Sequence, residues 1–381
     1  MPDMANSLKI TVAGAGIGGL AVAAALAQKG YVVRVAERAE AITEVGAGIQ
    51  ISPNGFAVLD ALGLGEQIAA IAPRAQTVRL LDGLTGREVV ALDLSLRPNL
   101  SWHFVHRAEL IDLLLKAAQG AGVAVDTGRE ISPPPEGAAL DGDDLLIGAD
   151  GLKSVLRARV DDARKPKFTG QVAWRAIIPD ADETPVVEVH MGPGRHLVSY
   201  PLGQGRRNIV AVEEREAWAE EGWSFEDHPA NLRAAFSSFA RPVKAWLDQI
   251  DKVYLWGLYR HPVAHRWFNG SQVLLGDAAH PTLPFLAQGA NLALEDAWTL
   301  AAAVTQRGIK AGLPAYQMAR VARTVQTVNA ATQNARNYHL KSPPVRFLGH
   351  GLMRLAGATM PEKMLARFDW LYAHDVTNTQ F

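Results

Sequence analysis

The chain has 381 residues, a formal net charge of -1 and no cysteine. The lack of cysteine excludes disulfide bonds, a cysteine-ligated zinc site and a thiol nucleophile. The near-neutral charge gives no reason to expect a nucleic acid or an anionic membrane as partner. The apolar stretch from Val12 to Ala27 is too short and too rich in glycine to span a bilayer, and it lacks the flanks of a signal peptide. We therefore expect a cytoplasmic protein without an integral membrane segment, with two or three domains or one large α/β body with an inserted lobe.

The N-terminal part of the chain predicts a βαβ unit. Residues 9–13 (KITVA) indicate a short buried strand, residues 14–19 a glycine turn, residues 20–29 an alanine-rich helix, and residues 31–36 (YVVRVA) a second strand. This order favours a parallel sheet.

The next elements alternate in type. In chain order we expect a helix over residues 53–71, a hairpin over 77–94 with its turn at 83–86, an amphipathic helix over 107–121, and an apolar strand over 144–147.

From residue 167 to 259 the pattern changes and predicts an inserted antiparallel sheet. Its strands are expected at residues 171–178, 186–190, 196–201 and 208–213, crossed by a helix over 231–250. Residues 273–275 then return to the parallel sheet, and alanine-rich helices follow from 289 to about 335. The tail from residue 341 is expected to be helical in patches, broken at Pro343, Pro344 and Pro361.

The glycine turn has the spacing of a dinucleotide-binding motif. Gly14 lets the strand turn tightly, Gly16 lets the backbone approach a pyrophosphate, and Gly19 lets helix and strand pack closely. The N–H groups and positive dipole end of the helix would then face the phosphates, so Ile17 and Gly18 belong to the same site. The alternative is a glycine-rich turn that packs without a ligand.

An acidic residue after the turn supports the prediction that the turn binds a dinucleotide. Glu37 ends the second strand at about the 20-residue spacing expected of an acid that binds ribose hydroxyls. We include its neighbour Arg38 in this site. The turn does not distinguish NAD from FAD.

Two later motifs make that distinction. The first is Gly148-Ala149-Asp150-Gly151, followed by Ser154 and Arg157. The second is Gly276-Asp277-Ala278-Ala279-His280-Pro281, followed by Pro284, Gln288-Gly289-Ala290-Asn291 and Glu295-Asp296-Ala297. Together with the first turn, Val45–Gln50 (VGAGIQ) and His106–Leu110 (HRAEL), they resemble the fingerprint of the class A flavoprotein monooxygenases over residues 8 to 335. This family includes 4-hydroxybenzoate, salicylate, 3-hydroxybenzoate and 6-hydroxynicotinate hydroxylases.

The resemblance implies an α/β fold with a Rossmann-like FAD-binding domain of the GR2 type, as in 4-hydroxybenzoate hydroxylase, an inserted antiparallel-sheet substrate lobe and a helical C-terminus. The expected divisions are a discontinuous FAD-binding domain (1–75, 100–166 and 265–335), a substrate lobe (76–99 and 167–264) and a C-terminal segment (336–381). It also implies FAD and NAD(P)H as cofactors and O2 with a small aromatic substrate as partners. We expect no metal and no nucleic acid, and a monomer or homodimer.

The family assigns cofactor roles to several of these residues. By resemblance Asp277 holds the ribityl chain of FAD, and the N–H groups of Gly289, Ala290 and Asn291 face the flavin N1–C2=O edge, where a helix N-terminus stabilises negative charge. Asp277 could instead only cap a helix.

Three further residues are expected at the cofactor. Gly48 belongs to the VGAGIQ stretch, and Arg107 would pair with a phosphate or another polar cofactor edge. Asp150, with Arg157, resembles positions that contact both FAD and the nicotinamide cofactor. Arg107 could instead form a surface ion pair, and Asp150 could be part of a plain turn.

The resemblance implies hydride transfer from NAD(P)H to the flavin, capture of oxygen as a C4a-hydroperoxide, and oxygen transfer to an electron-rich ring. Water must be kept out, and the apolar stretch Pro281–Leu286, which includes Pro284, suits that task. The stretch could also be ordinary loop packing.

The base that activates a phenol is harder to identify. Some relatives carry histidine where this chain has Gln50, and some carry it on the strand where this chain has Glu213-Glu214-Arg215. The remaining candidates are His196 and Tyr200, which share one face of a strand, and Arg175, which could hold a substrate carboxylate. Each could instead be an ordinary surface or core residue.

Three other functions stay open. One is a ring hydroxylase of quinone biosynthesis with an isoprenoid-tailed substrate, which apolar side chains over residues 347–372 could contact. Another is a nicotinamide-dependent dehydrogenase or reductase without oxygenation. The third is a non-catalytic flavin-binding interaction protein.

Overall fold

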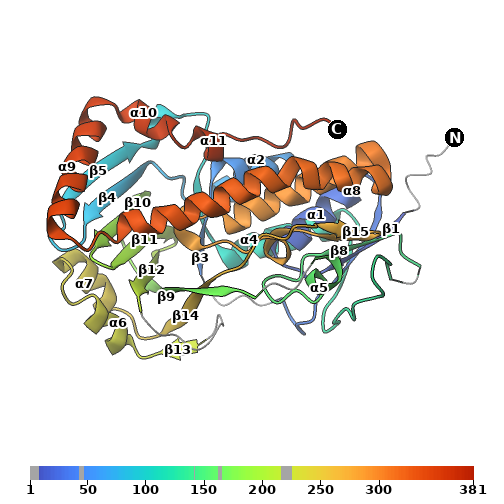
Figure 1. The fold of residues 1–381 in the computed structure, drawn as a ribbon, viewed down its shortest axis with the longest axis horizontal. Coiled ribbons are helices and arrows are strands. Elements are labelled where there is room, and N and C mark those ends of the chain that lie inside the picture. The colour runs from blue at the N-terminus through green and yellow to red at the C-terminus, as the bar shows by residue number, and fades with distance from the viewer. Residues whose placement is uncertain (1–7, 43–46, 141, 162–164, 216–224) are drawn as a thin grey trace.

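The computed structural model describes residues 8–42, 47–140, 142–161, 165–215 and 225–381. Two large sheets lie side by side, one near the termini and one at the other end of the molecule (Figure 1). Val45 and Gly46, from the VGAGIQ stretch, lie outside the described residues.

The sheet near the termini has six strands in the order β15-β16-β8-β1-β2-β7. Its strands are β1 (Lys9–Ala13), β2 (Val32–Ala36), β7 (Ala124–Asp126), β8 (Leu145–Gly148), β15 (Phe268–Asn269) and β16 (Gln272–Leu274). All pairs are parallel except β15 with β16, so the predicted parallel βαβ unit is confirmed. Residues 10–13 of β1 are all buried, as expected for a parallel strand covered on both faces.

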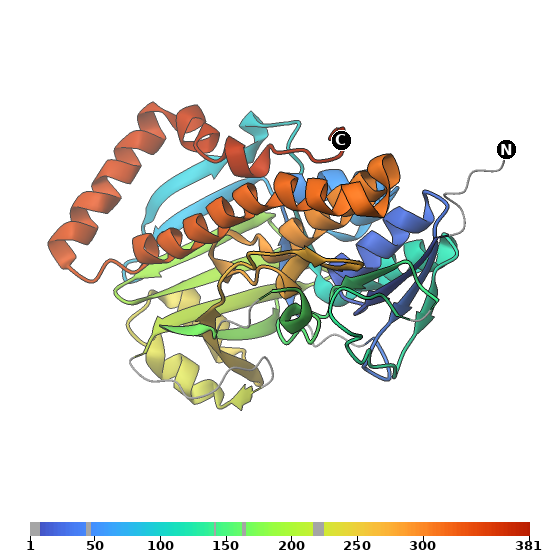
Figure 2. The ribbon, with the colours of Figure 1, turned by 45° about the vertical axis from the view of Figure 1, so that its right-hand side comes forward.

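Helix α1 (Ile17–Ala27) packs between α4 (Arg107–Gly120) and α8 (Gly289–Tyr338). Its residues from Ile17 to Leu26 are all buried. A helix that is apolar on every side is stable only when other elements surround it, which explains the alanine-rich sequence. Figure 2 shows the blue helix α1 next to the six-stranded sheet, and α1 contacts α8.

The second sheet has eight strands in the order β13-β14-β9-β12-β11-β10-β4-β5. They are β4 (Thr77–Asp82), β5 (Glu88–Asp93), β9 (Lys167–Pro179), β10 (Val186–Gly192), β11 (Arg195–Gly203), β12 (Arg206–Glu214), β13 (Phe225–Asp227) and β14 (Val253–Arg260). The sheet is antiparallel, as expected, except that β4 runs parallel to β10. The reason is that the predicted hairpin β4–β5, which comes from an earlier segment, adds to the edge of the sheet through β4.

Several predicted helices are shorter in the structure. The helix expected over 53–71 is two helices, α2 (Pro53–Ala61) and α3 (Gly65–Ile71), because Gly63 adopts a positive φ of 83° between them. The helix expected over 231–250 is also two, α6 (Pro229–Ala235) and α7 (Arg241–Asp248). Pro242 lies in the first turn of α7, where proline starts a helix but cannot continue one.

Smaller elements connect the two sheets. Strands β3 (Gly48–Ile51) and β6 (His103–His106) form a separate antiparallel pair that the sequence did not predict. The remaining short elements are η2 (Leu94–Leu96), α5 (Arg157–Val160), η3 (Gly276–Ala278) and η4 (Pro284–Leu286).

Helix α8 bends at Gly308, where φ is 70° and ψ is 171°. Its second part runs along the molecule from the six-stranded to the eight-stranded sheet (Figure 1). The tail then forms α9 (Pro343–Thr359), α10 (Pro361–Ala366) and α11 (Asp369–Tyr372). The helical tail is interrupted at Pro343, Pro344 and Pro361 as expected, and these prolines lie in the first turns of the helices that follow, α9 and α10. Among the described residues, no helix combines the length and hydrophobicity needed to cross a bilayer.

Candidate active site

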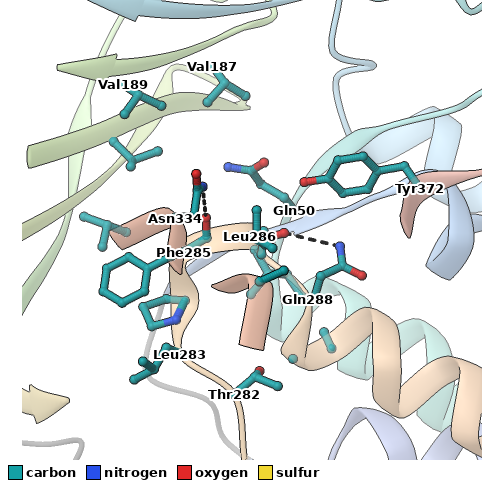
Figure 3. Close-up of a pocket in the computed structure, with 18 of the residues that line it drawn as sticks. Gln50, Val187, Val189, Thr282, Leu283, Phe285, Leu286, Gln288, Asn334 and Tyr372 are labelled. Carbon is teal, nitrogen blue, oxygen red and sulfur yellow. Dashed lines mark hydrogen bonds between the residues drawn. The ribbon is translucent and has the colours of Figure 1, made fainter. Parts of the chain in front are cut away.

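A cavity of about 1090 Å³ lies between the two sheets. Its walls come from the start of α1, strand β3, one face of the eight-stranded sheet, residues 281–287 and the start of α8. Figure 3 shows Val187 and Val189 on one side of it, with Leu283, Phe285 and Leu286 on another. Ligand sites typically measure roughly 300–1,000 Å³, so this cavity can hold a cofactor ring and a substrate together.

The glycine turn forms one end of the cavity. A Cβ on Gly14, which has a φ of 103°, would lie 2.5 Å from the Ala149 carbonyl oxygen, and a Cβ on Gly19 would lie 2.0 Å from that of Gly14. These two glycines are therefore required by packing. A Cβ on Gly16 would meet nothing within 4 Å, and Gly16, Ile17 and Gly18 line the cavity. The turn is thus open where a pyrophosphate would approach, which fits FAD.

Glu37 orders this turn from the end of β2. Its Oε2 accepts a hydrogen bond of 2.8 Å from the Ala15 N–H, and its Oε1 accepts one of 2.9 Å from the Ala39 N–H. Arg38 is exposed beside it. Glu37 and Arg38 are absent from the cavity wall, and contact of either with ribose stays a prediction.

Asp277 and Arg107 come together although 170 positions separate them in the sequence. Both line the cavity, Asp277 from η3 and Arg107 from the first turn of α4. Burial raises the pKa of Asp277, while the charges of His280 and Arg107 oppose that rise. This arrangement fits a carboxylate that accepts hydroxyl donors from a cofactor chain.

The start of α8 also faces the cavity. The N–H of Leu292 makes the first bond of the helix, to the Gln288 carbonyl, so the preceding N–H groups have no partner within the helix. Gly289 and Ala290 line the cavity, as the flavin-facing position requires.

The Asn291 side chain binds the backbone near β3 and does not line the cavity. Its Oδ1 accepts a 3.0 Å bond from the Ser52 N–H, and its Nδ2 donates over 3.0 Å to the Gln50 carbonyl. It is fully buried and joins α8 to the end of β3. Contact between its backbone N–H and the flavin stays a prediction.

Gly48 is held by a residue of the eight-stranded sheet. Its N–H donates to Asn208 Oδ1 over 2.9 Å, and a Cβ at this position would lie 2.7 Å from the Asn208 side chain. Because Gly48 also lines the cavity, this contact joins β3 to the eight-stranded sheet at the cavity wall.

Asp150 binds its own loop. Its Oδ2 accepts hydrogen bonds from the Val155 N–H (2.9 Å) and the Leu156 N–H (3.3 Å), and burial raises its pKa. Its neighbours Ala149 and Gly151 line the cavity, but Asp150 does not. Arg157 donates to the Ala278 carbonyl and so supports the turn that carries Asp277. A contact of Asp150 with either cofactor stays a prediction.

Arg175 projects from β9 into the cavity. Its guanidinium lies over the Trp256 ring at 4.7 Å, and burial lowers its pKa to about 10, so it stays charged at neutral pH. Its Nε is buried and has no hydrogen-bond partner in the part of the chain that the structure describes. Among the described residues, no carboxylate forms an ion pair with Arg175. An anion in the cavity would satisfy this charge.

Tyr200 and His196 both line the cavity from β11. Burial raises the pKa of Tyr200, although the charge of Arg175 and a hydrogen bond with Asn208 oppose the rise. Burial, together with the neighbouring His339, lowers the pKa of His196 well below its ordinary value. At neutral pH both side chains are therefore uncharged.

Other cavity residues come from the predicted flavin side and from the C-terminal helices. Gln50, Asn334 and Tyr372 surround the same space (Figure 3). Asn334 Nδ2 donates to the Phe285 carbonyl over 3.1 Å and thus holds the loop that contains Pro284. No local motif marks Asn334 and Tyr372, which line the cavity, or His339, which lies 2.7 Å from His196. They could not be predicted from the sequence, because only the path of the chain from α8 onward brings them to these places.

Matches to known proteins agree with this geometry. A family model described as FAD binding domain matches residues 7–331. The chain belongs to this FAD-binding family. Its relatives include the 3-amino-4-hydroxybenzoate 2-monooxygenase of Streptomyces cremeus, 36% identical over 89% of this chain and 90% of the relative. The 3-hydroxybenzoate 6-hydroxylase of Polaromonas naphthalenivorans is 33% identical over 99% of both chains.

A solved structure is similar over nearly its whole length. HpxO of Klebsiella pneumoniae, in complex with FAD and uric acid, matches with a TM-score of 0.82 at 27% identity, covering 95% of this chain and 97% of HpxO. These findings confirm the expected family, fold and FAD cofactor, and the reaction class of a flavin-dependent aromatic monooxygenase. They favour that class over the dehydrogenase and the non-catalytic alternatives.

Proposed function

We propose that this FAD-binding protein hydroxylates a single-ring aromatic acid that carries a phenolic hydroxyl, with NAD(P)H as reductant and O2 as oxidant. The observation that carries the proposal is the charged Arg175 in a largely apolar cavity, without an acidic partner among the described residues. A carboxylate on the substrate would supply that partner through charge-assisted hydrogen bonds.

The residues of the chain then have separate tasks. FAD, when bound and reduced, supplies the chemistry that activates oxygen. The Gly14–Gly19 turn, Asp277 and the start of α8 would hold the cofactor. Residues 281–286 would keep water out of the reaction space, and Arg175 would orient the ring through its carboxylate. His196 and Tyr200 are the groups on β11 that could contact the phenolic hydroxyl.

The relatives support this substrate class. Two of them are named for hydroxybenzoates, which combine a carboxylate with a phenol. Uric acid, bound to HpxO, is an electron-rich heterocycle without a carboxylate, so the fold itself does not dictate an aromatic acid. Arg175 is the feature of this chain that favours one.

A second candidate is an aromatic substrate with an apolar substituent, as in the isoprenoid-tailed alternative. The cavity extends to Leu352, Met353 and Met364 of α9 and α10, opposite Leu92 and Leu94. This apolar extension could hold a chain attached to the ring.

A substrate panel tests both candidates. The purified holoenzyme would be mixed with hydroxybenzoates, with the matching phenols that lack the carboxylate, and with alkyl-substituted phenols. The readouts are stimulated NAD(P)H oxidation and a product with one added oxygen. Product from the acids with roughly tenfold or greater preference over the matching phenols supports the proposal. Product from alkyl phenols alone would favour the second candidate, and no oxygenated product from any compound would refute both.

A cytoplasmic location and a monomeric or dimeric state stay proposals. A freely diffusing nicotinamide cofactor as reductant supports the location. Sedimentation of the holoenzyme would test the oligomeric state.

A further inference from the structure

Two buried histidines and a glutamate form a chain of hydrogen bonds that leads away from the cavity. His196 Nδ1 lies 2.7 Å from His339 Nε2, and His339 Nδ1 lies 3.0 Å from Glu214 Oε1. Glu214 Oε2 lies 2.6 Å from the ammonium group of Lys341. The four residues come from β11, the position directly after α8, β12 and the segment before α9.

Exposure rises steadily along this chain. The side chains of His196 and His339 are buried, that of Glu214 is 30% exposed and that of Lys341 is 71% exposed. His196 lines the cavity, whereas Glu214 and Lys341 do not. The chain therefore connects the wall of the cavity with the surface of the protein.

The charge on Glu214 fixes which nitrogen carries each proton. Burial raises the pKa of Glu214, but hydrogen bonds from Lys341 and His339 outweigh this and hold the pKa below its ordinary value. A carboxylate can only accept, so His339 Nδ1 donates to it. Burial lowers the pKa of His339, which keeps the ring neutral and leaves Nε2 as an acceptor. His196 Nδ1 must then donate to His339 Nε2.

This assignment leaves His196 with an unprotonated Nε2. Within the described part of the chain, no hydrogen-bond partner contacts that nitrogen, and His196 lies in the cavity wall. A neutral imidazole with a free acceptor in a substrate site has the form that a general base requires. The rings of Phe285 and Tyr338 lie 5.7 and 5.1 Å from the His196 ring and restrict its movement.

We propose that His196 Nε2 takes the proton of the substrate's phenolic hydroxyl and that His339 and Glu214 pass a proton to the surface. The inference rests on the proposed function, because it requires a phenol in the cavity. The phenolic O–H bond breaks and an N–H bond forms at His196 Nε2. The Nδ1 proton of His196 moves to His339 Nε2, the Nδ1 proton of His339 moves to Glu214, and water beside Lys341 takes the proton from Glu214.

The other groups around the chain agree with this direction of transfer. Lys341 and Arg195 oppose a positive charge on His339, and Tyr338 faces His196 as a neutral phenol because burial raises its pKa. The Gln171 amide lies 3.4 Å from His339 Nδ1, a longer contact than the one to Glu214. A proton therefore does not stay on His339, and the shorter contact, to Glu214, is its way onward.

The test uses the FAD-loaded enzyme and a nitrophenol that carries a carboxylate, whose phenolate form absorbs visible light. The enzyme–probe complex is formed at a pH where the phenol is protonated and is mixed rapidly with a more alkaline buffer. The rate of phenolate appearance reports proton transfer out of the cavity. We expect His196→Gln, His339→Gln and Glu214→Gln each to slow it by roughly tenfold or more, with little change in FAD content.

His190→Gln is the matched control. His190 is also a buried histidine of the same sheet, 3.2 Å from Glu188, but it does not line the cavity. Its substitution should leave the rate unchanged. Wild-type rates in both His339→Gln and Glu214→Gln would overturn the proposed path.

A second measurement does not depend on the substrate. In holoenzyme labelled with 15N at its histidines, the ring nitrogen shifts report which nitrogen carries the proton. The proposal requires Nδ1–H and a bare Nε2 on both His196 and His339. A proton on His196 Nε2 would overturn it. If the probe fails to bind but these tautomers are found, the arrangement of the chain is supported and the proposed substrate class is refuted.

Discussion

Arg320 Nε donates to Asp296 Oδ1 over 2.7 Å, and both side chains are fully buried. Asp296 lies before the bend of α8 at Gly308 and Arg320 lies after it, so the pair joins the two parts of the helix. Asp296 Oδ2 also accepts from the Gly276 N–H over 3.0 Å and lies 2.5 Å from His280 Nε2. The same carboxylate therefore positions the turn that presents Asp277 to the cavity.

Removal of Arg320 should strongly destabilise the fold. Arg320 also lies 2.5 Å from the buried Glu295, so Arg320→Met would remove a cation that two buried carboxylates contact. Loss of one member of such a group typically costs about 3–5 kcal/mol. Denaturant unfolding of the FAD-free protein would measure this loss.

The control is an ion pair near the surface. Arg97 and Asp369 are 31% and 43% exposed, and Arg97→Met should cost less than about 1 kcal/mol. Equal effects of the two substitutions would show that the buried network does not stabilise the protein in this way.

The same network makes stability dependent on pH in the acid range. Burial raises the pKa of Asp296, but His280 and Arg320 lower it more, to about 2. A carboxyl whose pKa is lowered by folding adds stability above its unfolded pKa, and this stability is lost as the pH falls toward the folded value. The Asp296 contribution should therefore fall by about 1 kcal/mol between about pH 5 and about pH 3.

Asp296→Asn isolates that contribution. The unfolding free energy of wild type minus that of Asp296→Asn should be larger at the higher pH. If the difference is constant over this range, Asp296 does not titrate in the way that its surroundings imply.

Two glycines of one turn should respond differently to alanine. Gly16→Ala adds a methyl group into open space in the FAD-free protein, but into the place where a pyrophosphate would approach. We expect FAD to bind at least about tenfold more weakly, which corresponds to about 1.4 kcal/mol. The stability of the FAD-free protein should change by less than about 1 kcal/mol.

Gly19→Ala is the comparison within the same turn. Its methyl group would lie 2.0 Å from the Gly14 carbonyl oxygen, so strand and helix must move apart. FAD-free Gly19→Ala should unfold at a clearly lower denaturant concentration than Gly16→Ala. Equal stability of the two FAD-free variants, or tight FAD binding by Gly16→Ala, would contradict the assigned roles.

The cofactor side of the site could be predicted from the sequence because its chemistry lies in short motifs at strand ends. Gly14–Gly19 follows β1 and Asp277 follows β16, and parallel strands of one sheet present their carboxyl ends at one edge. The role of Asn291 could not be predicted in the same way. Its place in the motif indicated the flavin, whereas its side chain binds Ser52 and Gln50.

The substrate side depends on contacts between distant segments. His196 could be proposed from its strand, but His339 is 143 positions away, and only the straight second part of α8 brings it to the lobe. In the sequence, Glu214 belongs to a stretch where some relatives carry a histidine. In the structure it binds a histidine that comes from another element.

Arg175 gives a direct test of the substrate's carboxylate. Arg175→Gln keeps a polar side chain but removes the charge, so an aromatic acid would lose a charge-assisted hydrogen bond worth roughly 1.5–3 kcal/mol. We expect KM for a hydroxybenzoate to rise by roughly tenfold to a hundredfold, while binding of the matching phenol without a carboxylate changes little. Arg175→Lys should recover part of the loss, because the charge returns without the planar fork.

The FAD content of the purified variants shows whether a change in KM comes from substrate binding or from loss of the cofactor. Arg175 lies on β9 and has no contact with the glycine turn among the hydrogen bonds and ion pairs of the described residues, so both variants should retain the flavin as wild type does. If Arg175→Gln weakens the acid and the phenol equally, Arg175 does not bind a carboxylate and instead supports the cavity wall through its contact with Trp256. If Arg175→Gln releases FAD, the guanidinium belongs to the cofactor site. Its anionic partner is then part of the flavin and not a substrate carboxylate.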